Sequence, residues 1–289
     1  MDNFRGAVLM VLAMLGFALE DMFIKLLAGA VSVGQILVML GVGGSVVFGA
    51  IVLMQGKALF SRDMLTLPIG LRALGEMVGT MCFVSAIVLT PISSASAILQ
   101  ATPLAVTLGA ALFLGEPVGW RRWSAIIVGL CGVLLIVRPG MDSFEVLSLL
   151  AVMAVFMLAL RDLATRKTPA AISSMQLSFL GFAVVIPAGL ILMQFSSSAP
   201  SSLTPREWLY FGGALGIGLF AYYAIVAAMR IGEVSFVTPF RYSRLLFALV
   251  IGVTIFDESP DSLTLLGAAI IVASGIYTVW RERRVALRA

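Results

Sequence analysis

Long apolar runs, separated by short clusters of charged residues, extend along the chain to about residue 280. A helix that spans a bilayer needs roughly 20 consecutive apolar residues. The run 77–115 is long enough for two spans and is divided by the turn signal Thr90-Pro91. The pattern therefore predicts an all-α polytopic membrane protein with ten transmembrane helices. We place these at residues 4–28, 33–55, 65–89, 94–114, 121–138, 144–166, 170–195, 207–229, 234–256 and 262–281.

The composition supports this interpretation and excludes some chemistry. Hydrophobic residues make up 61% of the chain and charged residues 12%, with a mean hydropathy of +1.08. Soluble proteins carry about a quarter of charged residues. The absence of histidine excludes an imidazole base and a His-ligated metal. Cys82 and Cys131 lie in apolar stretches, where we expect reduced thiols. We expect no catalytic residues, no metal and no cofactor.

Lysine and arginine residues predict the orientation, because they concentrate on the cytoplasmic side of a membrane protein. With the N terminus inside, only Arg138 and Arg206 fall on the outer side, and we expect both termini to be cytoplasmic. The net charge of +4 reflects this topology, and no nucleic-acid partner is needed to explain it. The internal residues are Arg5, Lys57, Arg62, Arg121, Arg122, Arg166, Lys167, Arg230, Arg281, Arg283, Arg284 and Arg288.

The two halves of the chain resemble each other at an offset of 141 residues. This offset aligns Asp21 with Asp162 and Gln35 with Gln176, and an offset of 142 aligns Glu116 with Glu258. The matches predict two repeats of five helices, over residues 1–141 and 142–289. Five is odd, so the second repeat must enter the membrane from the opposite side. Inverted repeats of this kind are typical of transporters that bind substrate between the halves.

The sequence resembles the EamA-type drug/metabolite transporter superfamily over essentially its whole length. The most specific motifs are Gly115-Glu116-Pro117, Asp257-Glu258-Ser259-Pro260 and the segment 239–247. The resemblance implies a carrier in the bacterial inner membrane that exports small metabolites by alternating access. Its amino-acid exporter branch is the most similar, which implies neutral and aromatic amino acids as substrates. The alternative is another metabolite such as S-adenosylmethionine.

Two further classes of protein remain as alternatives to a carrier. A membrane enzyme would be expected to cluster carboxylates near one interface, whereas Glu116 and Glu258 are repeat-related and lie beside loop prolines. A scaffold or receptor would need larger loops than this chain has. No glycine loop for ATP is present. We therefore expect a small-molecule substrate and a lipid bilayer as the only partners, and function as a monomer.

Charged residues inside the predicted spans are candidates for function, because each costs about 2.5 to 3.5 kcal/mol at the centre of a membrane helix. Asp21 and Lys25 are spaced for an ion pair near the end of their helix. Arg72 and Glu76 form either a second pair or part of the substrate environment. Glu20 needs an arginine from another helix. The remaining members are Arg161 and Asp162, expected to be structural, and Arg241 and Arg244, which either support the backbone or bind a carboxylate.

The resemblance places the cavity among the first, third, fourth, sixth, eighth and ninth helices. Polar and aromatic side chains in these helices are the expected substrate contacts, and Gln100 and Tyr222 are favoured because their spans are otherwise apolar. The steps Thr102-Pro103 and Thr238-Pro239 predict kinks that flex during transport. The expected substrate-binding residues are Phe17, Glu20, Arg72, Glu76, Phe83, Gln100, Phe156, Tyr222 and Tyr242.

Overall fold

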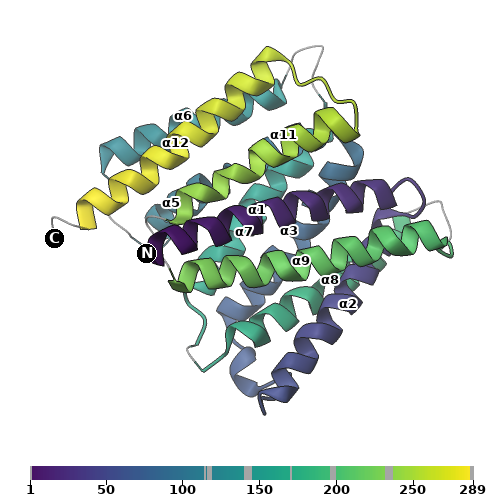
Figure 1. Cartoon of the computed structure of the whole chain (residues 1–289). Coiled ribbons are helices and arrows are strands. Elements are labelled where there is room, and N and C mark those ends of the chain that lie inside the picture. The colour runs from purple at the N-terminus through teal and green to yellow at the C-terminus, as the bar shows by residue number, and fades with distance from the viewer. Residues whose placement is uncertain are drawn as a thin grey trace.

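Helices account for most of the residues that the computed structural model describes (Figure 1). The structure describes residues 2–113, 115, 119–139, 145–169, 171–195, 200–231 and 237–286, and no strand occurs among them. The helices are α1 (Asp2–Leu27), α2 (Val33–Met54), η1 (Arg62–Met64), α3 (Leu67–Leu89), α4 (Ile92–Leu99), α5 (Thr102–Phe113), α6 (Trp120–Val137), α7 (Ser148–Thr165), α8 (Ser174–Phe195), α9 (Pro205–Ile231), η2 (Thr238–Tyr242), α11 (Ser243–Ile255) and α12 (Ser262–Ala286).

The described residues contain nine helical segments that are long and apolar enough to cross a membrane, and a shorter apolar helix at Trp123–Val137. Together they match the ten predicted spans. Large apolar side chains such as Val46, Leu209 and Val250 are exposed on the outside of the bundle. This is the expected arrangement in lipid, where the backbone is satisfied within each helix and side chains can face hydrocarbon.

Two of the ten spans are interrupted, and the interruptions meet. The fourth span breaks at Gln100 and Ala101, and the ninth begins as the short 3-10 helix η2. A proline lies beside each interruption, Pro103 in the first turn of α5 and Pro239 in η2. Proline removes a backbone hydrogen-bond donor from a helix. The Gln100 amide donates to the Arg241 carbonyl at 3.2 Å, and the two residues are 141 positions apart. The predicted kinks are therefore confirmed as breaks, while their flexing stays a prediction.

Helix pairing follows the symmetry of an inverted repeat. The closest pairs are α1 with α9, α3 with α7, α2 with α8 and α6 with α12. The repeats relate α1 to α7, α2 to α8, α3 to α9 and α6 to α12. The pair α1–α9 therefore corresponds to the pair α7–α3, whereas the pairs α2–α8 and α6–α12 each correspond to themselves. The loops obey the same rule, because Gln35 donates to the Ser201 carbonyl at 2.7 Å and its repeat partner Gln176 donates to the Ala58 carbonyl at 2.9 Å.

Glycine allows the self-related pairs to approach closely. An added Cβ at Gly132 of α6 would lie 2.8 Å from the Gly267 carbonyl of α12, and one at Gly34 of α2 would lie 2.7 Å from the Gly189 carbonyl of α8. Figure 1 shows α6 and α12 running side by side at one edge of the molecule. The predicted boundary between the repeats, at 141 and 142, and Glu116 both lie outside the described residues.

Candidate substrate site

Charged side chains from four parts of the fold come together inside the bundle. They belong to α1 and α3 of the first repeat and to α7 and the η2–α11 span of the second. Four are arginines and four are carboxylates, so the group is balanced when all are ionised. We call it the charged network, and its members are Glu20, Asp21, Arg72, Glu76, Arg161, Asp162, Arg241 and Arg244.

The first part of the network joins α1 to α11. The Arg244 guanidinium contacts the Asp21 carboxylate at 2.6 Å, and the Asp21 side chain is only 4% exposed. The same guanidinium lies 5.3 Å from the ring centres of Phe17 and Phe83, where cation–π attraction favours it. The sequence-based Asp21–Lys25 pair is therefore wrong. An ion pair between two residues of one helix contributes only about 0.2–0.5 kcal/mol. Asp21 and Lys25 each pair instead with a residue from another part of the fold.

The second part joins α3 to α7. Arg72 and Glu76 are paired, which was one of the two alternatives, but loosely, at 3.8 Å. Glu76 is held closer by Arg161, at 3.1 Å, and Arg161 also contacts Asp162 at 2.8 Å. Gly75 permits this approach, since an added Cβ there would lie 2.8 Å from the Arg161 backbone nitrogen. Arg161 thus makes its ion pairs inside the protein, between α7 and α3.

Some members of the network have unmet capacity to bind. The Nε and Nη1 atoms of Arg72 are buried and lack hydrogen-bond partners, although the residue is only 7% exposed. Among the described residues, the Arg241 side chain makes no ion pair, and it lies within electrostatic range of Asp162. The Glu20 carboxylate packs against Gly218 of α9, where the described residues give it no hydrogen bond. Buried groups left in this state are costly, at about 1–3 kcal/mol each.

The unmet groups flank one turn of α9. Glu20 lies against Gly218, and Tyr222, four residues further, is within electrostatic range of Arg72. Four residues of a helix rise about 6 Å. The Tyr222 hydroxyl shares a hydrogen bond with Ser178 of α8. Glu20 and Arg72 therefore both lie near this turn of α9, the first with a carboxyl group and the second with a guanidinium.

The other predicted residues are placed differently. Gln100 is buried and joins the two broken helices. Tyr242 is buried with its hydroxyl against Gly275 of α12. Phe156 is 47% exposed and lies about 140° around α7 from Arg161, so the structure does not bring it to the network. The expected substrate-binding residues omitted five members of the charged network, although their position inside apolar runs was the signal that could have included them: Asp21, Arg161, Asp162, Arg241 and Arg244.

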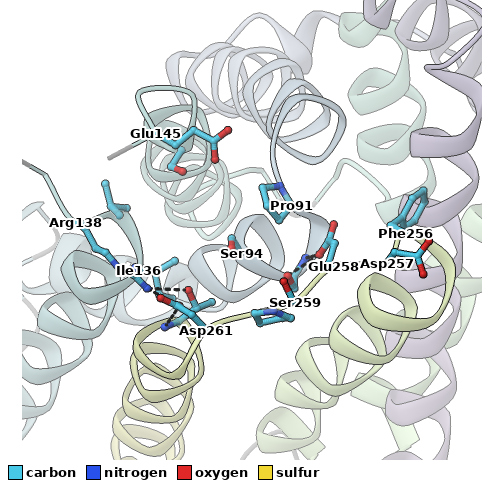
Figure 2. A pocket seen from close by; sticks show the side chains of 15 residues that line it. Pro91, Ser94, Ile136, Arg138, Glu145, Phe256, Asp257, Glu258, Ser259 and Asp261 are labelled. Carbon is cyan, nitrogen blue, oxygen red and sulfur yellow. Dashed lines mark hydrogen bonds and ion pairs between the residues drawn. The ribbon is translucent and has the colours of Figure 1, made fainter. Parts of the chain in front are cut away.

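A polar pocket opens where α4 begins and the α11–α12 loop passes over it (Figure 2). Its volume is about 440 Å³. The Glu258 carboxylate accepts bonds from Ile92, Ser93 and Lys25 here. Partial burial acts to raise the pKa of Glu258, but the bonds from Ser93 and Ile92 and the charge of Lys25 together hold it below its usual value. No metal-binding group of side chains occurs in the described residues.

Residues 4–138 and 147–280 each match the model of the EamA-like transporter family. The chain belongs to that family. The two matched segments correspond to the two repeats of the fold, and the protein is a multi-pass membrane transporter. A solved crystal structure superimposes over 95% of this chain and 98% of its own, with a TM-score of 0.60 and 21% identity, which shows the shared fold alone.

Relatives of known name are transporters of several different substrates. A riboflavin transporter of Vibrio cholerae is 33% identical over 67% of this chain, and the match spans 65% of that relative, slightly under two thirds of its length. An S-adenosylmethionine uptake transporter of Rickettsia prowazekii is 25% identical over 74% of this chain and 72% of its own. The pseudopaline exporter CntI of Pseudomonas aeruginosa is 26% identical over 94% of both chains. None of these three names is that of an amino-acid carrier.

Proposed function

We propose that this protein is a secondary carrier of amphoteric small metabolites, which bear both an ammonium and a carboxylate group, and that it works by alternating access between its repeats. It acts as a monomer in the bacterial inner membrane, with both termini in the cytoplasm, and has no enzymatic activity. The observation that supports the substrate class is the buried carboxyl group of Glu20, which makes no hydrogen bond among the described residues, together with the Nε and Nη1 atoms of Arg72, which lack hydrogen-bond partners. A ligand with both charges satisfies the two groups at once.

S-adenosylmethionine is the first candidate within this class. Its methionine end carries the carboxylate and the ammonium, its sulfonium adds a positive charge, and its adenine ring can stack on aromatic side chains. Phe17 and Phe83 offer such rings beside the network. Neutral and aromatic amino acids, which the resemblance implied, fit the same charge pair and form the second candidate group.

Riboflavin is the competing substrate, favoured by the 33% identity to the Vibrio cholerae transporter. It is neutral over its ring and ribityl chain, so it would offer neither a carboxylate to the unpartnered Nε and Nη1 atoms of Arg72 nor an ammonium to Glu20. A buried polar group without a hydrogen-bond partner costs about 1–3 kcal/mol. The charges of the network therefore favour an amphoteric ligand over riboflavin.

Binding to the purified protein tests the substrate class. We expect isothermal titration calorimetry to detect S-adenosylmethionine or a neutral amino acid and to give no signal with riboflavin. Binding of riboflavin without any amphoteric ligand would reject the proposed class. The expected discrimination rests on paired charges, so 0.5 M salt should change it little, because a buried site is poorly screened.

A further inference from the structure

The Glu258 carboxylate has four bonding partners from two other elements of the fold. Its Oε1 atom accepts from the Ile92 backbone N–H at 2.6 Å and from Lys25 Nζ at 3.1 Å. Its Oε2 atom accepts from the Ser93 backbone N–H at 3.0 Å and from the Ser93 hydroxyl at 2.6 Å. The side chain is only 10% exposed. Both oxygens are thus fully engaged.

This carboxylate supplies a helix cap that α4 cannot supply itself. The residue before α4 is Pro91, whose side chain makes no capping bond. The first N–H groups of a helix have no partners within it, and the helix dipole favours an anion there. Glu258 satisfies the N–H groups of Ile92 and Ser93 from a loop more than 160 positions away in the chain.

The contacts join the first repeat to the second. Lys25 lies in the last turn of α1 and also donates to the Thr90 carbonyl at 2.7 Å. Thr90 and Ser93 lie on either side of the start of α4. Glu258 lies in the loop between α11 and α12. Figure 2 shows the Glu258 side chain directed at the start of α4, with dashed lines for hydrogen bonds between them. Separation of the two repeats at this end of the bundle therefore requires all four bonds to break.

The loop is shaped to deliver this carboxylate. Asp257 has a positive φ of 51°, and the Glu258 N–H returns to the Gly252 carbonyl at 2.9 Å. An added Cβ at Gly252 would lie 2.6 Å from Glu258 Oε2, so a larger residue there would displace the carboxylate from its present position.

We propose that Glu258 is the latch that holds this end of the transporter closed, and that its release from α4 and Lys25 is required for the cavity to open here. This inference rests on the proposed carrier function for its biological meaning. The latch acts on the equilibrium between the closed and open forms of this end of the protein. That equilibrium can be measured without substrate.

Thiol labelling of Ser96→Cys in a Cys82→Ala/Cys131→Ser background tests the latch. Ser96 is fully buried, three residues beyond Ser93 on the same side of α4. N-ethylmaleimide reaches it only when this end opens, so the labelling rate follows the open fraction. Glu258→Gln keeps the shape but presents an amide NH₂ to donors. We expect labelling about tenfold faster or more, with Lys25→Met giving a smaller increase because the cap remains.

Asp261→Asn is the matched control. Asp261 lies in the same loop, but it pairs with Arg138 at the end of α6. It therefore joins α6 to α12, which already pack together, and bridges neither α1 nor α4. We expect its labelling rate to remain within about twofold of the parent. A second reporter, Ala13→Cys, lies buried about 18 Å along α1 from Lys25 and should not label faster in Glu258→Gln.

Three results would overturn the latch: Glu258→Gln labelling at the parental rate, Asp261→Asn labelling equally fast, or the Ala13→Cys reporter accelerating as much as Ser96→Cys. The last would indicate general loosening. If Glu258→Gln fails to give a monodisperse protein, Lys25→Met decides, and an unchanged rate there rejects the proposal. These readouts use no substrate, so a failure of the proposed function leaves them intact.

Discussion

Replacement of Arg72 by glutamine should weaken binding of carboxylated ligands selectively. Arg72 is only 7% exposed, and its Nε and Nη1 atoms have no hydrogen-bond partner. Its contact with Glu76 is loose at 3.8 Å, and Glu76 keeps Arg161 at 3.1 Å when Arg72 is lost. The substitution therefore removes a ligand contact while leaving the rest of the network paired.

The magnitude follows from the bonds that a carboxylate would make with Arg72. A hydrogen bond to a charged group contributes about 1.5–3 kcal/mol, and about 1.4 kcal/mol corresponds to a tenfold change in Kd. Loss of one such bond predicts a rise in Kd of about 10- to 100-fold for S-adenosylmethionine or phenylalanine. Ligands without the carboxylate, decarboxylated S-adenosylmethionine and phenethylamine, should change by about threefold or less.

Isothermal titration of the four ligands against the parent and Arg72→Gln measures this difference. Arg206→Gln is the matched control, because Arg206 is exposed on α9 and donates to Tyr210 at 2.7 Å, outside the network. The reasoning is refuted if both members of a ligand pair weaken equally, or if carboxylated ligands bind Arg72→Gln as tightly as the parent.

Three further predictions follow from the same contacts. Glu20→Gln should raise Kd about tenfold for ligands with an ammonium group, and titration with unchanged affinity would exclude Glu20 from the site. Gly132→Ala should destabilise the protein by about 1–3 kcal/mol, seen as a lower Tm, because its Cβ meets backbone of α12; an unchanged Tm would contradict the close approach. The pKa of Glu258 is lowered, so its ionised carboxylate stabilises the folded protein above the ordinary pKa of a glutamate, and this stabilisation is lost as pH falls through the lowered pKa. The Tm of the parent should therefore drop with acidification more than the Tm of Glu258→Gln. Parallel plots of Tm against pH for the two proteins would contradict this.

The fold was predictable because a bilayer imposes a strong pattern on sequence. Run length, together with the turn signal Thr90-Pro91, located the ten spans, with ends such as Leu89 and Phe195 close to those observed. The offset of 141 residues predicted the inverted pairing, and the Gln100–Arg241 contact has that same separation. The break at Gln100 and the short helix at Thr238–Tyr242 followed from their prolines.

The site was only partly predictable, because its contacts are between helices. Spacing along one helix suggested an Asp21–Lys25 pair, whereas Asp21 meets Arg244 on α11 and Lys25 meets Glu258 beyond it. No local pattern encodes which helices become neighbours. Phe156 illustrates the same limit, since a position in the right helix does not determine which face it occupies.

Counterflow in proteoliposomes tests the central claim most directly. Vesicles that contain the purified protein and are loaded with unlabelled S-adenosylmethionine, or with a neutral amino acid in parallel, are diluted into a trace of the same labelled compound with no ion gradient. A secondary carrier that works by alternating access should accumulate the label transiently, and riboflavin should not replace the amphoteric compound. Absence of transient accumulation for every amphoteric compound, together with counterflow of riboflavin, would contradict the account.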